Sequence, residues 1–408
     1  MRENTPPRIQ DIEDDEDVEE DYLIGDNEEF EEVTIEDLEA MVGGSHDHSD
    51  DDEDNNDAEP EPRTPVQDDA ILTLRGHAGS AFTCSMHPTK DWAVTGGEDD
   101  KAIVWNTQTG EKIHTVEGHK DSVIETHFSS DGSYLATGDM AGEIMVFKIS
   151  DDLTKIWDYS MGDMCWMKWH RAANVLIAGS EAGEIYIWRI PSGDCKILPG
   201  NGVKCESAEI TGDGKKLLAG YGNGTVKLWD IKSNSIVMEV ELNHPMAHKD
   251  NVSTVSCDKE NPVYMTGGED GKILFLTNSG PVGSVEAGGP VECVAFSPSA
   301  DFKVAASGTL QGQIAIWDYQ KYSMRTQCEH QQIDDGVTSM KWISDHTLLV
   351  GTIQGNIFGY DARNGSRIFT LSGHLGDIYA MQYNAREGIV MSVSEDQTAK
   401  IFKCPTLE

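Results

Sequence analysis

Residues 76–106, with the sequence GHAGSAFTCSMHPTKDWAVTGGEDDKAIVWN, decide the fold of this chain. A Gly-His pair opens the stretch, and three runs of alternating apolar residues follow at 81–86, 92–97 and 102–105. Turn residues separate these runs, so the pattern predicts three short β-strands joined by tight turns. The same unit recurs to the end of the chain at a period of about forty residues, which is typical of stacked β-units.

The repeats align on the last strand of each unit, where a bulky residue falls five positions after a turn residue. That position holds, in order, Trp105, Phe147, Trp188, Trp229, Leu276, Trp317, Tyr360 and Phe402. The spacings between them are 42, 41, 41, 47, 41, 43 and 42 residues, so eight units fill residues 71–404.

Each unit is predicted to supply four short strands. The expected innermost strands carry Cys84, Phe128, Trp166, Ile210, Val255, Val294, Met340 and Met381. The hairpins between the next two strands contain Gly142, Gly183, Gly224, Gly271, Gly312 and Gly355. Since a sheet of this size buries neither face alone, the units must pack face to face around an axis, which predicts a β-propeller.

The Gly-His openings and the Trp-Asp pairs of these units resemble WD40 repeats. The Gly-His openings end at His77, His119 and His374, and the Trp-Asp pairs are Trp229-Asp230 and Trp317-Asp318. In that family each repeat gives the outer strand of one blade and the inner three strands of the next. The resemblance implies an all-β propeller of eight blades over residues 70–405, closed by 71–74 beside Phe402. Trp157-Asp158 lies ten residues after Phe147, out of phase, and is expected on an outer strand.

The family's hydrogen-bonded tetrad of His, Ser or Thr, Asp and Trp is complete in the first repeat. Its members are His77, Thr95, Asp99 and Trp105. The fifth repeat offers His248, Thr266 and Asp270 with Leu276, and the last offers His374, Ser392 and Asp396 with Phe402. The Asp position of the other repeats holds Ala141, Ala182, Asn223, Gln311 and Gln354, so no tetrad is expected there. A buried His and Asp that satisfy each other have a structural role, and no catalytic residue is predicted.

Residues 1–69 are expected to form a disordered acidic tail. Residues 1–70 contain 29 Asp or Glu against three Arg, a net charge of −26. Such a composition buries too little apolar surface to fold. One apolar island at 30–42 predicts a short amphipathic helix, either a docking motif or a transient helix without a role. His46 and His48 lie among carboxylates, but a solvated tract is the preferred interpretation over a metal site.

The rest of the chain is acidic too, because the total of −41 leaves −15 for residues 71–408. Nucleic acid and anionic membranes are poor partners for such a field, whereas a basic protein segment suits it. An acidic surface that serves solubility alone is the alternative. In propellers of this family the loops entering the innermost strands share one face with the hairpins joining the second and third strands. On that face the alignment places the predicted partner-binding rim: Glu98, Asp121, Asp163, Glu181, Asp250, Glu269, Asp335, Asp377 and Glu395, with Asp334 beside them.

Catalytic motifs and cofactor signatures are missing from the sequence. Residues 220–224 resemble a phosphate loop but lie in a predicted hairpin with no helix after it. None of the eight Cys forms a Cys-x-x-Cys pair, and no zinc spacing or nucleophile elbow occurs. We therefore expect a non-enzymatic monomer without metal or cofactor. Without a signal peptide or a bilayer-spanning run, a reduced cytoplasmic location is expected.

The sequences of particular loops resemble one family within the WD40-repeat proteins. Residues 93–102, 118–123, 136–140 and 162–170, together with the acidic tail, are similar to the angio-associated migratory cell protein family. That resemblance implies one of two roles. Fungal relatives are chaperones that capture the basic N-terminal segment of a nascent large-subunit ribosomal protein, and animal members are linked to cell migration as scaffolds. A ubiquitin-ligase substrate adaptor is a third interpretation, which fits WD40 propellers in general.

Overall fold

The computed structural model describes residues 65–150, 152–299, 301–329 and 335–405. The chain divides into two compact units, 1–61 and 62–408, and the described strands belong to the second. The expected disorder of the tail, its helix at 30–42 and the His46 and His48 pair lie outside the described residues. Among the described residues, no helix is long and apolar enough to cross a membrane.

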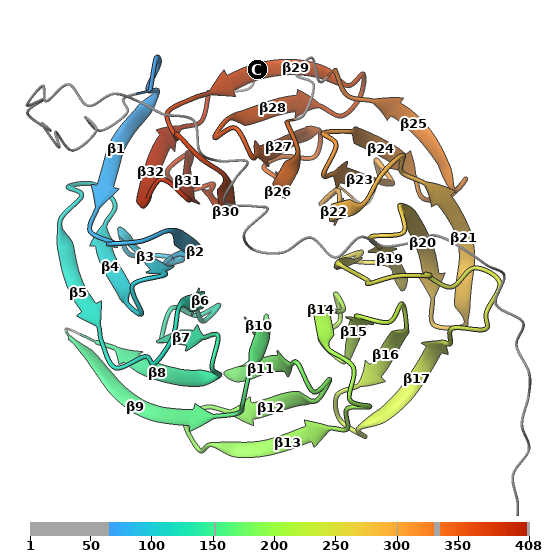
Figure 1. Cartoon of the computed structure of the whole chain (residues 1–408), viewed down its shortest axis with the longest axis horizontal. Coiled ribbons are helices and arrows are strands. Elements are labelled where there is room, and N and C mark those ends of the chain that lie inside the picture. Colours follow the sequence, from blue (N-terminus) through green and yellow to red (C-terminus); the bar gives the residue numbers. More distant parts are fainter. Residues whose placement is uncertain (1–64, 151, 300, 330–334, 406–408) are drawn as a thin grey trace, which may run out of the picture. The chain divides into compact units, whose positions relative to one another are not determined.

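Thirty-two β-strands form eight four-stranded sheets arranged as blades around a central channel (Figure 1). All neighbouring strands within a blade are antiparallel, as the first blade's registers illustrate. This arrangement confirms the predicted eight-bladed propeller.

Within each blade the strands follow one another from the channel outward. Blade 1 comprises β2 (Ala81–Met86), β3 (Trp92–Gly97), β4 (Ala102–Asn106) and β5 (Lys112–Val116). Blade 2 comprises β6 (Val123–Phe128), β7 (Tyr134–Asp139), β8 (Glu143–Ile149) and β9 (Leu153–Ser160). Blade 3 comprises β10 (Met164–Trp169), β11 (Val175–Ser180), β12 (Ile185–Arg189) and β13 (Asp194–Leu198). Blade 4 comprises β14 (Cys205–Ile210), β15 (Lys216–Tyr221), β16 (Val226–Asp230) and β17 (Ser235–Val240).

The second half of the ring follows the same order. Blade 5 comprises β18 (Thr254–Cys257), β19 (Val263–Gly267), β20 (Lys272–Thr277) and β21 (Gly280–Glu286). Blade 6 comprises β22 (Val291–Phe296), β23 (Val304–Thr309), β24 (Ile314–Asp318) and β25 (Ser323–Gln327). Blade 7 comprises β26 (Val337–Trp342), β27 (Thr347–Thr352), β28 (Ile357–Asp361) and β29 (Ser366–Leu371). Blade 8 comprises β30 (Ile378–Asn384), β31 (Ile389–Ser394), β32 (Thr398–Lys403) and β1 (Ala70–Arg75).

Blade 8 closes the ring with a strand from the start of the propeller. β1 pairs antiparallel with β32, and Thr73 lies opposite Lys400. The Lys400 ammonium, which is 2% exposed, lies 2.6 Å from an Asp68 carboxylate oxygen and donates to the Thr73 hydroxyl at 3.1 Å. The predicted closure by residues 71–74 is confirmed, and the ion pair between the buried Lys400 and the more exposed Asp68 reinforces it.

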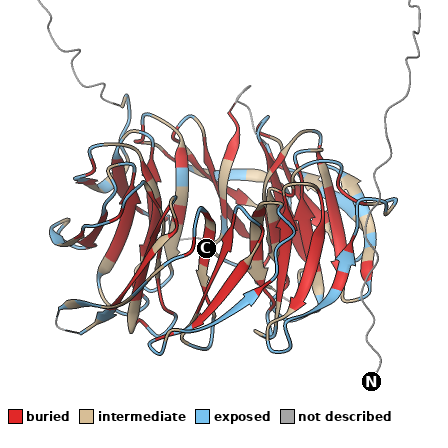
Figure 2. Cartoon of the chain, turned by 60° about the horizontal axis from the view of Figure 1, so that its bottom comes forward, coloured by how far each residue is buried: buried red, intermediate tan, exposed pale blue. Residues whose placement is uncertain are grey.

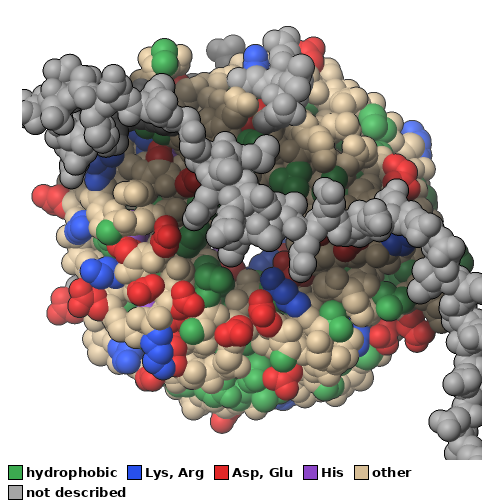
Figure 3. Space-filling view, in the orientation of Figure 1, with side chains coloured by type: hydrophobic (Ala, Val, Ile, Leu, Met, Phe, Trp, Pro, Cys, Tyr) green, Lys and Arg blue, Asp and Glu red, His purple; other side chains and the backbone are tan. Residues whose placement is uncertain are grey.

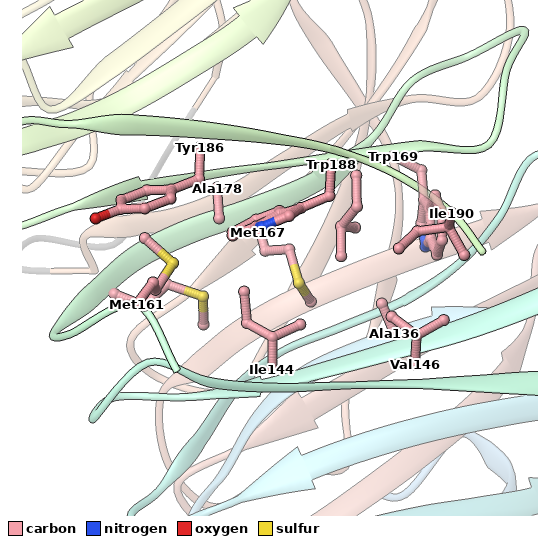
Figure 4. Close-up of a cluster of buried hydrophobic side chains, with 12 residues drawn as sticks. Ala136, Ile144, Val146, Met161, Met167, Trp169, Ala178, Tyr186, Trp188 and Ile190 are labelled. Atoms are coloured by element: carbon pink, nitrogen blue, oxygen red, sulfur yellow. The ribbon is translucent and has the colours of Figure 1, made fainter. Parts of the chain in front are cut away.

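The core lies between neighbouring blades, where each sheet buries its two faces against the next (Figure 2). The eight aligned bulky residues all lie on the third strand of their blades and are at most 6% exposed. Figure 4 shows the interface of blades 2 and 3, where Ile144 and Val146 face Met167 and Trp188. Burying a side chain of this size stabilises the fold by about 1.5–3 kcal/mol. Trp157 lies on the outer strand β9, as predicted.

A β-bulge opens the innermost strand in seven of the eight blades. In blade 1, for example, Ala81 pairs with Gly97 and Thr83 with Gly96, which leaves Phe82 outside the ladder. The equivalent residues of the other six blades are Ile124, Cys165, Glu206, Glu292, Thr338 and Tyr379. A bulge re-aims the side chain of the extra residue, and these seven residues lie where the channel-lining strands begin.

Candidate protein-binding face

One face of the ring, which we call the upper face, consists of the loops entering the innermost strands and the hairpins joining the second and third strands. In every blade one backbone hydrogen bond ties the hairpin to the entry loop, such as Glu98 N–H to Ser80 O at 2.9 Å and Glu395 N–H to Asp377 O at 3.0 Å. The predicted rim residues lie in these two sets of loops, so the fold brings them to one face. Figure 3 views this face and shows Asp and Glu side chains near the channel opening, over blades 1 to 3.

Seven of the nine predicted rim residues are exposed, and Asp377 is half-buried. Among the described residues, Glu181 alone of these eight has a Lys or Arg within 4 Å, at 3.8 Å from Lys204. Asp335 differs, because its side chain is completely buried and accepts a hydrogen bond from the Gln354 N–H at 3.2 Å. Asp335 therefore stabilises the blade 7 hairpin through this hydrogen bond and is not an exposed residue of the rim. Asp334 lies outside the described residues.

The first-blade tetrad has the predicted geometry. His77 Nδ1 lies 2.7 Å from Asp99 Oδ1, and His77 Nε2 lies 2.8 Å from Thr95 Oγ1. The Trp105 indole N–H donates to the same Thr95 hydroxyl at 2.9 Å. The tetrad joins the entry loop to the hairpin, and it thereby fixes the backbone that presents Glu98.

Blade 2 also contains a buried His–Asp pair, which the alignment did not predict because the aligned Asp position holds Ala141. Asp139 Oδ2 lies 3.2 Å from His119 Nδ1, and His119 Nε2 lies 2.9 Å from Thr137 Oγ1. Asp139 is the last residue of β7, two positions before the aligned Ala141. Burial alone would raise the pKa of Asp139, but hydrogen bonds from His119 and from the backbone N–H groups of Lys120 and Glu143 outweigh burial and lower that pKa.

Blades 5 and 8 have three-membered versions of the tetrad, as predicted. His248 lies 3.0 Å from Asp270 and 2.9 Å from Thr266, and the equivalent distances from His374 in blade 8 are 2.9 and 2.8 Å. Burial alone would raise the pKa of Asp270, but hydrogen bonds with His248 and the Lys249 N–H lower it to about 2. These carboxylates are therefore ionised at neutral pH and occupied with structural hydrogen bonds.

The blade 8 and blade 1 junction concentrates negative charge around an exposed aromatic pair. The rings of Phe82 and Tyr379 lie 5.3 Å apart, and Tyr379 is 38% exposed. Burial and the charges of Glu395, Asp377 and Glu98 raise the pKa of the Tyr379 phenol. Burial and the charge of Glu395 likewise raise the pKa of Asp377. This pattern indicates carboxylates that repel one another beside an apolar platform.

Two acidic residues of the upper face were not among the rim residues predicted from the sequence. Glu206 and Glu292 occupy the bulge positions of β14 and β22. Burial and the charges of Glu269 and Glu206 raise the pKa of Glu292. Lys204 lies 3.2 Å from Glu206, so the negative charge is partly compensated beside blade 4. A charged residue at the second position of an innermost strand is the signal that identifies both.

Carboxylates deeper in the channel are paired. Glu209 of β14 lies 2.9 Å from the Lys168 ammonium and 2.6 Å from the Arg171 guanidinium. The contrast with the rim shows which carboxylates are free to meet an external cation. Within the described ranges, no group of three or more His, Cys, Asp or Glu has the geometry to hold a metal ion.

The fold and its tetrads define a protein of the WD40-repeat class. The family model for the WD domain, G-beta repeat, matches residues 69–106, 110–158, 194–230, 280–318 and 365–403. Within this class the chain belongs to the angio-associated migratory cell protein family. It is 33% identical over 358 residues to the human protein of that name, covering 82% of this chain and 80% of the human one.

Two fungal proteins are more distant relatives. The ribosome assembly protein SQT1 of Saccharomyces cerevisiae is 23% identical over 367 residues, covering 80% of this chain and 83% of SQT1. The crystal structure of Chaetomium thermophilum Sqt1 bound to the N-terminus of the ribosomal protein L10 superposes with a TM-score of 0.77. That match covers 83% of this chain and all of the solved chain at 19% identity, and it shows a common fold.

Proposed function

We propose that this chain is a non-enzymatic cytoplasmic chaperone that binds a basic, extended segment of a ribosomal protein on its upper face. The observation that carries the proposal is the ring of rim carboxylates that have no Lys or Arg partner within the described ranges, among them Glu98, Asp163 and Glu395. The Chaetomium Sqt1 relative, whose solved complex contains the N-terminus of L10, supports the class of client. One basic segment of the client occupies the upper face of one propeller, so a monomer of this chain suffices.

The physical basis is the summed field of many weak sites. An exposed ion pair contributes only about 0.2–1 kcal/mol, so no single carboxylate dominates. A ring of them forms a negative funnel that attracts Lys and Arg from a distance and shields a basic segment from RNA. The Phe82 and Tyr379 pair adds apolar and cation–π contact for an arginine at the blade 8 and blade 1 junction.

The test is a titration with a basic peptide of about fifteen residues from the N-terminus of ribosomal protein L10. The triple variant Glu98→Lys, Glu181→Lys and Glu269→Lys is expected to bind at least tenfold more weakly. It should melt only slightly below the wild type, because it loses two exposed hydrogen bonds, from the Ser80 N–H to Glu98 and from the Asn251 amide to Glu269. The matched control reverses Glu260, Asp301 and Asp345, which are exposed in the hairpins of the opposite face. It changes the net charge equally and is expected to bind far better than the rim variant.

The acidic tail is the competing location for the client. A chain lacking residues 1–60 should keep most of its affinity if the rim binds the peptide. Loss of binding in that truncated chain, together with full binding by the triple variant, would refute the rim proposal.

The name of the human relative favours a second candidate, a scaffold in cell migration. Partners recovered from cells distinguish the two. One stoichiometric ribosomal protein supports the chaperone, whereas cytoskeletal or receptor proteins without it support the scaffold.

A further inference from the structure

A groove of about 640 Å³ lies between blades 3 and 4 on the side of the ring opposite the upper face. Strands β11 to β13 form one wall, and the hairpins between β14 and β15 and between β16 and β17 form the other. Val175, Ile187 and Ile231 give the groove an apolar lining. The Lys196 ammonium donates to the Lys232 carbonyl at 3.1 Å and thereby links the two walls.

The groove is basic, although the chain has 72 acidic residues against 31 Lys and Arg. Arg189, Lys196, Lys215 and Lys232 all line it and are exposed. None of the four has a carboxylate within 4 Å in the part of the chain that the structure describes, unlike Lys168 or Lys204 elsewhere. The groove therefore combines four cations with an apolar lining on a chain that is acidic in total.

The two acidic residues of the groove accept hydrogen bonds within their own turns. Asp230 Oδ1 accepts hydrogen bonds from the N–H groups of Lys232 and Ser233 and from the Ser233 hydroxyl. Asp194 accepts a hydrogen bond from the Ser192 hydroxyl at 2.8 Å. Both carboxylates therefore stabilise their own hairpins and do not neutralise the four cations of the groove.

We propose that this groove binds a short acidic peptide segment with apolar side chains, independently of the basic client on the upper face. The carboxylates would meet the four cations, and the apolar side chains would pack on Ile187 and Ile231. Nucleic acid is the less favourable occupant, because a long polyanion extends beyond the groove onto an acidic surface and gains nothing from an apolar lining.

Cys195 provides a reporter inside the groove. It lines the groove and is the one exposed residue among the eight cysteines. A synthetic twelve-residue peptide in which Glu alternates with Leu and Phe is added to the full-length protein, and alkylation of Cys195 is followed by mass spectrometry. Saturating peptide is expected to slow this alkylation several-fold. The same peptide with Lys for Glu, which would suit the upper face, should leave the rate unchanged.

Charge reversal tests the cations. Arg189→Glu, Lys215→Glu and Lys232→Glu together should weaken binding of the acidic peptide about tenfold or more. The matched control, Lys101→Glu, Lys155→Glu and Lys321→Glu, changes the net charge equally at exposed positions outside the groove. It should bind several-fold better than the groove variant. Lys196 is left intact because it holds the walls together.

Two results would overturn the proposal. One is unchanged alkylation of Cys195 at every peptide concentration. The other is protection by a uridine oligonucleotide but not by the acidic peptide, which would make the groove a nucleic-acid site. Neither result bears on the L10 peptide titration, so failure of the groove proposal is distinct from failure of the chaperone proposal.

Discussion

His119 and Asp139 form a fully buried pair that is built from a different sequence position than in the other tetrads. Nδ1 and Oδ2 lie 3.2 Å apart, and both side chains are 0% exposed. Asp139 occupies the position of Gly97 in blade 1, where an added Cβ would lie 2.8 Å from His77 Nδ1. A side chain at this strand end thus points at the histidine, which explains how Asp139 replaces the hairpin aspartate.

Removing this carboxylate should destabilise the protein. Asp139→Ala leaves His119 and the Lys120 N–H without their acceptor, so we expect the free energy of unfolding to fall by about 1–3 kcal/mol. Urea denaturation measures the change. The neighbouring Met140, which is 49% exposed, supplies the control, since Met140→Ala should change stability by less than about 0.5 kcal/mol. Equal stability of the two variants would contradict the structural role.

The blade 5 aspartate should make stability depend on acidic pH. The pKa of Asp270 in the folded protein is about 2, below its ordinary value of 3.8. A depressed pKa contributes stability that is complete above the unfolded value and is lost as pH falls through the folded one. Asp270→Asn should therefore cost about 2 kcal/mol at pH 7 and nothing extra near pH 2. Urea denaturation of the wild type and of Asp270→Asn between pH 2 and pH 7 measures this difference. If the two free energies of unfolding change in parallel with pH, the charge of Asp270 does not contribute to stability.

Closure by β1 should be essential for stability. Deleting residues 1–75 removes β1 together with its pairing to β32 and the partners of the buried Lys400 ammonium, so the chain should melt far lower than the wild type. Deleting residues 1–60 spares all of these and should change the melting temperature little. If the two truncated chains melt alike, the closure contributes nothing.

Client binding should weaken in mild acid, and Asp377 should contribute to that loss. Its pKa is raised by burial and by Glu395, so this rim carboxylate loses its charge before an ordinary aspartate does. Asp377→Asn should reduce affinity for the L10 peptide about twofold to fivefold at neutral pH, as expected for the loss of one ion pair near the surface. It should also reduce the pH dependence of binding, which calorimetry at decreasing pH would detect. An unchanged pH profile would exclude Asp377 from the binding face.

Added salt, like mild acid, should weaken binding of the client to the rim. Raising ionic strength above 0.15 M shortens the screening length below about 8 Å, so affinity for the L10 peptide should fall steeply. A complex held mainly by apolar contact would keep its affinity across the same titration, and that outcome would refute the electrostatic basis of the proposal.

The periodic part of the molecule was predictable. Alternating apolar runs at a constant spacing located every third strand from Trp105 to Phe402, because each blade must bury the same faces against its neighbours. The tetrads of blades 1, 5 and 8 followed from the same alignment, since their hairpins have equal length. The shared face of the rim loops also followed, because strand order alone decides which turns lie together.

Features that depend on contacts across blades were not predictable. Asp139 lies two positions out of alignment, and only the direction of a strand end shows that it reaches His119. Asp335 was assigned to the rim, but the folded loops bury it beneath Gln354. Glu206 and Glu292 become part of the upper face through bulges that the apolar pattern does not reveal.

Sequence by itself therefore determined the number of blades, their order and the sign of the charge, because periodicity and composition are properties of the chain. Tertiary structure alone decided which charges are paired and which stand free. Lys168 and Glu209 are 41 residues apart and neutralise each other, whereas Lys215 and Lys232 line an open groove and have no carboxylate partner in the part of the chain that the structure describes. Electrostatic pairing requires distances of a few ångströms, and only packing brings residues from different blades that close.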